Sequence, residues 1–216
     1  MENRVIIVDY QLGNLFSVKQ ACEYLGFKAI ISSNAGDLLN ADFVILPGVG
    51  AFADAMNNLH EFGLAEGIRK YTASGKPFMG VCLGLQLLLS ESEEFGKTKG
   101  LGIIPGVVRK FDVQKIGNNT LKVPQIQWNT IDETSKNIWQ HTPLGCCKPG
   151  DYMYFVHSLY AEPADQVTIL AQTIYGKKKY CSAILHKNVF ATQFHPEKSG
   201  LHGVDIYREW FNLNRK

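Results

Sequence analysis

The chain has 216 residues, of which 45% are hydrophobic and 19% charged, and its formal net charge is +2. This composition is typical of a globular protein with a substantial core and excludes a largely disordered chain. The small net charge gives no general electrostatic attraction to nucleic acid. No apolar stretch reaches the roughly 18 residues that a membrane span needs, so we expect no membrane partner either.

Strands and helices alternate in the first half of the sequence. The apolar run at residues 4–10 predicts a strand buried on both faces, and Asn14 is placed to cap a helix that ends at Gly26. Further strands are predicted at 27–32, 42–48 and 77–84, and helices at 52–60, 64–73 and, beginning with "LQLLLSE", from 85 onward. This alternation predicts an α/β fold with a mostly parallel central sheet and helices on both faces.

The second half is rich in strand-like segments and closes with a helix at 203–211. The predicted strands lie at 106–111, 121–131, 151–162, 167–176 and 180–196, with a turn at 117–119 and a solvated hairpin turn at 177–179. We expect these strands to add an antiparallel part to the sheet. No linker or repeat interrupts the pattern, so residues 1–216 are predicted to form one domain.

Cys82 stands out among the five cysteines because "GVCLG" places it between Gly80 and Gly84. The pattern is that of a nucleophile elbow, in which a sharp turn from strand to helix exposes the central side chain. The turn strains the central residue and leaves no room for a Cβ on either side. The turn would also place the sulfur near a helix N-terminus, whose dipole favours the thiolate. The alternative is a structural cysteine in the core.

The other cysteines carry weaker signals. None has the spacing of a metal site, and an odd number favours free thiols in the reducing cytoplasm. Cys146 and Cys147 are adjacent and could be redox-active, although packing or surface roles are the simpler interpretation. We expect no metal and no cofactor.

A thiolate that cleaves an amide needs a proton donor, and His195 is the strongest candidate among the six histidines. Glu197 follows two positions later, across Pro196, which favours an extended chain. Residues at i and i+2 of an extended chain lie on the same side, so Glu197 could orient the imidazole. His157, in "YFVHS", is a second candidate.

The loop "LPGVGAF" follows a predicted strand and exposes backbone N–H groups around Val49 and Gly50. Such groups could stabilise the oxyanion of a tetrahedral intermediate. Gly48, Gly50 and Ala53 also fit a dinucleotide fingerprint, but that motif normally belongs to the first strand-to-helix turn.

Together these motifs resemble those of the class I (triad) glutamine amidotransferases, and among them the HisH-type glutaminase subunits of imidazole glycerol phosphate synthase. The similarity runs along nearly the whole chain, through "VDYQLGNLFSVKQA", "LPGVGAF", "GVCLGLQLLLSESEE", "GLGIIPGVV", "KVPQIQWN", "YFVHS" and "FHPEKSG". The resemblance implies a flavodoxin-like fold and hydrolysis of L-glutamine to glutamate and ammonia. It also implies a heterodimer with a (β/α)8, HisF-type synthase subunit that receives the ammonia for histidine biosynthesis.

The resemblance also implies roles for single residues. Cys82 would attack the glutamine amide, His195 would pass a proton to ammonia, and Glu197 would hold His195. The remaining roles would be an oxyanion hole at Val49, Gly50 and Leu83, substrate contacts at Gln86, His157 and Ser158, and partner contacts at Asn14, Trp128 and Lys198.

The sequence departs from the HisH pattern at four positions in segments close to the expected partner interface, one of which is Ile126 in place of Met. Gln11 stands where these chains usually have Gly, and Gln125 and Gln127 stand where they have His and Gly. These departures leave open a second glutaminase function, in which a HisH-like paralogue supplies ammonia for amidination of a bacterial surface sugar. A non-catalytic binding subunit is a third alternative, which the complete triad disfavours.

Overall fold

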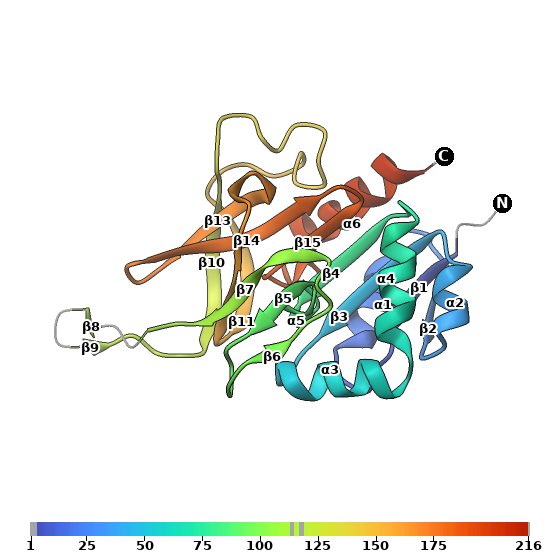
Figure 1. The fold of residues 1–216 in the computed structure, drawn as a ribbon. Helices are drawn as coiled ribbons and strands as arrows, with labels where there is room; N and C mark the ends of the chain where they lie inside the picture. The colour runs from blue at the N-terminus through green and yellow to red at the C-terminus, as the bar shows by residue number, and fades with distance from the viewer. Residues whose placement is uncertain (1–3, 113–114, 117–118, 216) are drawn as a thin grey trace.

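The computed structural model describes residues 4–112, 115–116 and 119–215. Its main element is a 13-stranded mixed sheet with the central order β2-β1-β3-β4-β15-β14-β12-β7-β5-β6 (Figure 1). The parallel strands are β1 (Val5–Val8), β2 (Ala29–Ser32), β3 (Phe43–Gly48), β4 (Phe78–Cys82) and β15 (Val189–Thr192). Their order, 2-1-3-4-5, is that of flavodoxin-like sheets, as predicted.

The rest of the sheet is largely antiparallel. Its strands are β5 (Leu89–Ser92), β6 (Thr98–Lys99), β7 (Ile104–Lys110), β10 (Gln125–Glu133), β11 (Asp151–His157), β12 (Leu159–Pro163), β13 (Ile169–Tyr175) and β14 (Lys178–His186). Strand β5 pairs with β7 in parallel, whereas the pairs β10–β11, β12–β14 and β13–β14 are antiparallel. Strands β8 (Lys115–Ile116) and β9 (Asn119–Thr120) pair antiparallel. Of the turn predicted at 117–119, residues 117 and 118 lie outside the described residues and Asn119 belongs to β9.

Helices cover both faces of the parallel strands. They are α1 (Leu15–Tyr24), α2 (Ala35–Leu39), α3 (Phe52–Glu61), α4 (Leu64–Ala73), α5 (Leu83–Leu87) and α6 (Gly200–Asn214), with short 3-10 turns η1 (Gln166–Thr168) and η2 (Pro196–Lys198). No helix among the described residues combines the length and apolar character that crossing a bilayer requires.

Strand β1 shows why this stretch of sequence folds as a central strand. Val5 and Ile7 belong to the core on the side of α1 and α6, and Ile6 and Val8 belong to the core on the side of α2, α3 and α4. All four side chains are fully buried. Burial of each contributes roughly 1.5–3 kcal/mol, so a continuous apolar run is favoured only between two helical layers.

The helix predicted from residue 85 onward is wrong beyond its first turn. Helix α5 ends at Leu87, and β5 begins at Leu89. The carbonyl oxygens of Leu87, Leu88 and Leu89 accept hydrogen bonds from the backbone of residues 101–104 instead of from the next helical turn. Long-range pairing therefore replaces the helix, and an apolar run buried on every side carries no periodicity that could reveal this.

Other boundaries differ from the prediction by the insertion of turns. The strand predicted at 151–162 is two strands broken at Ser158, and that at 180–196 is a hairpin turning at 187–188. The strand predicted at 121–131 begins at Gln125, and α2 was not predicted. Asn14 precedes α1 as expected, but its side chain accepts from the Ser17 hydroxyl and caps no backbone N–H.

Candidate active site

Cys82 occupies the turn between β4 and α5, at the carboxyl edge of the parallel strands. Its φ of 55° and ψ of −108° are strained for a residue with a side chain. A Cβ on Gly84 would lie 1.8 Å from the carbonyl oxygen of Leu46, and one on Gly80 would lie 3.0 Å from that of Gly84. The predicted mechanical reason for both glycines is therefore confirmed.

A cavity of about 270 Å³ opens beside Cys82. It brings together seven of the residues predicted from the sequence, namely Val49, Gly50, Cys82, Leu83, Gln86, His157 and Ser158. These residues come from the loop after β3, from the β4–α5 turn and from the break between β11 and β12. The fold thus collects one concave site from segments that are far apart in the sequence.

His195 and Glu197 form a buried pair next to Cys82. The Nδ1 atom of His195 donates to Oε1 of Glu197 over 2.7 Å, and the two side chains are only 2% and 1% exposed. Burial favours the neutral imidazole, but the negative charges of Cys82 and Glu197 outweigh it and raise the pKa of His195 to about 10. Nε2, the nitrogen left for proton transfer, has no hydrogen-bond partner among the described residues.

His157, the second candidate base, is in a different state. Its Nδ1 donates to the carbonyl oxygen of Leu159 over 2.7 Å, and Tyr180 Oη lies 3.3 Å from its Nε2. Burial, with a smaller contribution from the charge of His195, lowers the pKa of His157 to about 4. His157 is therefore neutral near pH 7 and forms a wall of the cavity.

The loop that carries Val49 and Gly50 is fixed at both ends. Tyr10 donates its hydroxyl to the carbonyl oxygen of Pro47 over 2.9 Å, and a carboxylate oxygen of Glu94 accepts from the Phe52 backbone N–H over 2.6 Å. Between these anchors Val49 is 39% exposed, and Gly50 has a φ of 116°, which favours glycine. Val49 and Gly50 thus line the Cys82 cavity on a short, tethered segment.

Two polar residues of the site were missed by the sequence analysis. Glu94 lines the cavity and is its only carboxylate among the described residues. Gln193 is fully buried and places its Nε2 3.7 Å from the sulfur of Cys82. Gln193 lies only two residues before the predicted His195, at the end of the strand predicted at 180–196, and this nearness is a signal that could have identified it.

The predicted partner residues lie at the same edge of the sheet. Trp128 and Lys198 both contact the ring of Tyr154. The ring centroids of Trp128 and Tyr154 are 6.1 Å apart, and Nζ of Lys198 lies 6.0 Å from the Tyr154 centroid. Asn14 precedes α1, which packs against η2. Of the departures from the HisH pattern, Gln127 is exposed but Gln125 is fully buried and accepts from Tyr180, so Gln125 cannot contact a partner directly.

The other described cysteines lie outside this cavity. Burial raises the pKa of Cys22 to about 12 and also raises that of Cys181, which keeps both as thiols. Cys146 and Cys147 place their sulfur atoms 3.8 Å apart on the loop before β11, and a hydrogen bond from Cys147 lowers the pKa of Cys146. A packing or surface role for this pair stays the prediction, with redox activity as the alternative.

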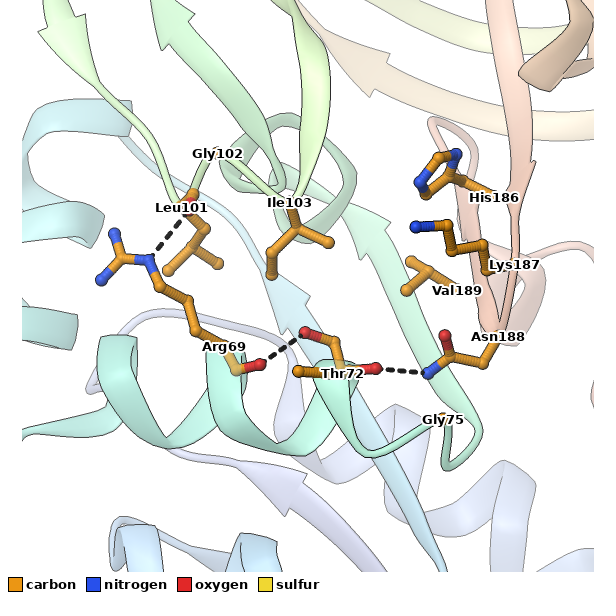
Figure 2. A pocket seen from close by; sticks show the side chains of 11 residues that line it. Arg69, Thr72, Gly75, Leu101, Gly102, Ile103, His186, Lys187, Asn188 and Val189 are labelled. Atoms are coloured by element: carbon orange, nitrogen blue, oxygen red, sulfur yellow. Dashed lines mark hydrogen bonds between the residues drawn. The ribbon is translucent and has the colours of Figure 1, made fainter.

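A larger cavity, of about 630 Å³, lies at the opposite, amino end of β4 and β15 (Figure 2). Arg69, His186 and Lys187 line it, but none of its described lining residues is a cysteine or a carboxylate. The Arg69 guanidinium turns away from His186 and Lys187, and its Nε donates to the carbonyl oxygen of Leu101 over 2.9 Å. Of these two cavities, the smaller one lies beside a candidate nucleophile and a histidine–carboxylate pair.

Comparisons with known proteins agree with this arrangement. The model of the family "Glutamine amidotransferase class-I" matches residues 6–212. The imidazole glycerol phosphate synthase subunit HisH of Chlorobaculum tepidum is 42% identical, covering 95% of this chain and 98% of its own. The same subunit of Syntrophotalea carbinolica is 44% identical, covering 97% and 100%.

Solved structures show the same fold at lower identity. A crystal structure of a glutamine amidotransferase matches with a TM-score of 0.72 at 18% identity, over 97% of this chain and 98% of its own. PurLQS from Thermotoga maritima matches with a TM-score of 0.70 at 19% identity, over 98% and 99%. Since the family model and the HisH relatives both span nearly the whole chain, the chain belongs to the class I glutamine amidotransferases and, within them, to the HisH family.

Proposed function

We propose that this chain is the glutaminase subunit of a cytoplasmic imidazole glycerol phosphate synthase, formed as one domain and supplying ammonia to a (β/α)8, HisF-type partner in histidine biosynthesis. The observation that carries the chemistry is the strained turn that holds Cys82 at a cavity beside the buried His195–Glu197 pair. Free thiols at every described cysteine fit the reducing cytoplasm.

The reaction uses Cys82 as the nucleophile. Its thiolate sulfur bonds to the side-chain amide carbon of glutamine, and the carbonyl electrons move onto oxygen to give a tetrahedral intermediate. When the intermediate collapses, the C–N bond breaks and the nitrogen takes a proton from Nε2 of His195. Ammonia leaves, and a glutamyl thioester remains on Cys82.

Water completes the cycle. Neutral His195 takes a proton from water as the water oxygen attacks the thioester carbon, and the C–S bond breaks to return the thiolate. The products are glutamate and one ammonia for each glutamine and water consumed. Glu197 stabilises the imidazolium in both half-reactions because its carboxylate accepts from Nδ1.

The oxyanion is stabilised by backbone N–H groups. Leu83 is the first residue of α5, so its N–H has no acceptor within the helix and is available to the oxyanion. Val49 and Gly50 line the same cavity. Their backbone N–H groups complete the oxyanion hole.

The substrate is held by the walls of the cavity. Gln86 and the chain at His157–Ser158 contact the glutamine, and the Glu94 carboxylate offers a counter-charge to its α-ammonium group. One oxygen of Glu94 already accepts from Phe52 N–H, which fixes the position of the other. This assignment accounts for the one carboxylate that lines the described part of the cavity.

The partner surface surrounds the mouth of the site. Trp128 is 49% exposed beside Tyr154 and Lys198, and Phe16, near Asn14, is 67% exposed. Exposed aromatic residues with a nearby cation are typical of protein interfaces. Direct transfer at this surface matters because ammonia released into neutral water is mostly protonated and is then no longer a nucleophile.

The test is glutamate release by the purified chain, alone and with a purified histidine-type synthase subunit. We expect slow turnover by the chain alone and faster turnover with the partner. No turnover under either condition would contradict the glutaminase proposal. Turnover that this partner fails to stimulate would instead favour the surface-sugar paralogue. The observation behind that alternative is Gln127, an exposed departure from the HisH pattern.

A further inference from the structure

The sulfur of Cys82 has a polar neighbour outside the triad. Gln193 follows β15 and lies at the same edge of the sheet, with Nε2 3.7 Å from the Cys82 sulfur. The carbonyl oxygen of Val156 lies 3.8 Å from the sulfur and can accept a hydrogen bond only from the protonated thiol. Gln193 is fully buried, so water does not compete for its amide.

The orientation of the Gln193 amide follows from a chain of hydrogen bonds. The carbonyl oxygen of Leu159 can only accept, so the Gln86 atom 3.1 Å away from it must be the amide nitrogen. That nitrogen also lies 3.1 Å from one polar atom of the Gln193 side-chain amide, and this atom must therefore be the acceptor oxygen, Oε1. The nitrogen of Gln193 is left facing Cys82, because each amide has one donor end and one acceptor end.

The hydrogen bond from Gln193 would add to the stabilisation of the Cys82 thiolate by helix α5. A helix that begins at the nucleophile favours the thiolate through its dipole, but α5 has only five residues. A hydrogen bond to the charged form of a group favours that form, and a thiolate accepts more strongly than a thiol does. An amide directed at the sulfur therefore supplements the short helix.

We propose that Gln193 is a further catalytic residue, which donates its side-chain N–H to the thiolate of Cys82 and is held in that orientation by Gln86. The inference rests on the proposed assignment of Cys82 as the nucleophile. It also links the substrate cavity to the sulfur, because Gln86 lines that cavity and bonds directly to Gln193.

The test compares two variants of Gln193 in the full-length chain. Gln193→Glu keeps an oxygen for Gln86 but turns a second oxygen toward the sulfur, whereas Gln193→Met keeps the length and removes the donor. Ser182→Ala is the matched control. Ser182 is fully buried, and its backbone carbonyl oxygen accepts from the backbone N–H of Gln193. Its hydroxyl has no hydrogen-bond partner among the described residues. Circular dichroism and thermal unfolding establish that each variant is folded.

The main readout is the rate of alkylation of Cys82 by iodoacetamide as a function of pH, followed by mass spectrometry of the Cys82 peptide. In Gln193→Glu we expect the midpoint to rise by about one pH unit or more, with a smaller rise in Gln193→Met and none in Ser182→Ala. Glutamine turnover should show kcat lowered by about tenfold or more, with KM changed by less than about threefold.

An unchanged alkylation midpoint in the folded variants would overturn the proposal. If Gln193→Glu does not fold, Gln193→Met alone decides, and failure of both to fold would assign Gln193 to core stability and contradict a catalytic role. Alkylation needs no turnover, so this result is separate from the proposed function. The latter fails if Cys82→Ala still hydrolyses glutamine.

Discussion

Oε1 of Glu197 lies 2.7 Å from Nδ1 of His195, and both side chains are almost completely buried. A carboxylate in this position fixes the ring, leaves Nε2 free to exchange a proton and stabilises the charged imidazolium. Together with the thiolate of Cys82, it raises the pKa of His195 to about 10 against the opposing effect of burial. Charge at one edge of the sheet thus sets the protonation state that the chemistry needs.

Glu197→Gln should lower both activity and the His195 pKa. The variant keeps the size of the side chain but loses the negative charge, so we expect the pKa of His195 to fall and kcat to drop by roughly 10²- to 10⁴-fold, as in other triads. Titration of His195 by NMR and a glutaminase assay measure the two effects. An unchanged His195 pKa would show that Glu197 does not interact with the ring as described.

Gly84→Ala should destabilise the whole fold. The added Cβ would lie 1.8 Å from the carbonyl oxygen of Leu46, which belongs to the neighbouring strand β3 and cannot move freely. We expect a loss of about 3 kcal/mol or more in the free energy of unfolding, measured by urea denaturation.

Gly36→Ala is the matched control, because it adds the same methyl group to helix α2. There the nearest atom is the side-chain oxygen of Asn34 at 3.1 Å. We expect a change of no more than about 1 kcal/mol. Equal losses in the two variants would mean that close packing at the elbow is not what requires glycine at position 84.

The His157 side chain should make the chain sensitive to acid. Its pKa is about 4 in the folded chain and about 6.5 when unfolded, so the unfolded state binds a proton that the folded state excludes. The contribution to stability is therefore complete above pH 6.5 and is lost as the pH falls toward 4. Between pH 7 and pH 4 the free energy of unfolding should fall by about 3 kcal/mol more in the wild type than in the His157→Gln variant. Urea denaturation at pH 7 and pH 4 measures this difference. An equal fall in the free energy of unfolding of the two proteins would contradict the burial of a neutral His157.

Trp128→Ala should weaken binding of the proposed synthase partner without changing the fold. The indole is 49% exposed beside Tyr154, and its truncation removes an aromatic anchor, so we expect Kd to rise about tenfold or more. Tyr24→Ala is the control, because Tyr24 is 69% exposed at the far end of α1. Calorimetric titration with the partner measures both, and equal effects would place the interface elsewhere.

The structure brings the predicted site residues together, and they could be selected from the sequence because the signals that link them are local. Gly80 and Gly84 flank Cys82 within five residues, and His195 and Glu197 are two positions apart. The extended chain expected across Pro196 is wrong, because residues 196–198 form the 3-10 turn η2, yet the two side chains still meet. The alternation of strands and helices in the first half was likewise visible, because buried parallel strands require continuous apolar runs such as Val5–Val8.

The misses arose where long-range contacts decide the structure. Gln193 faces Cys82 across 111 positions, and its orientation depends on Gln86 and Leu159 from two other elements. The run after Leu87 became strand β5 because its carbonyl groups pair with residues 101–104. The sequence places Gln125 near the partner interface, but its side chain is fully buried and accepts a hydrogen bond from Tyr180. No local sequence pattern predicts this placement.

The most direct test of the account is to identify the residue that bonds covalently to the substrate carbon. The chain with its synthase partner would be treated with a glutamine analogue that carries a diazoketone in place of the side-chain amide, and the peptides would be analysed by mass spectrometry. We predict one adduct per chain, on the peptide containing Cys82, formed in step with the loss of activity and prevented by glutamine. Complete inactivation with Cys82 unmodified, or with the adduct on another residue, would contradict the central claim.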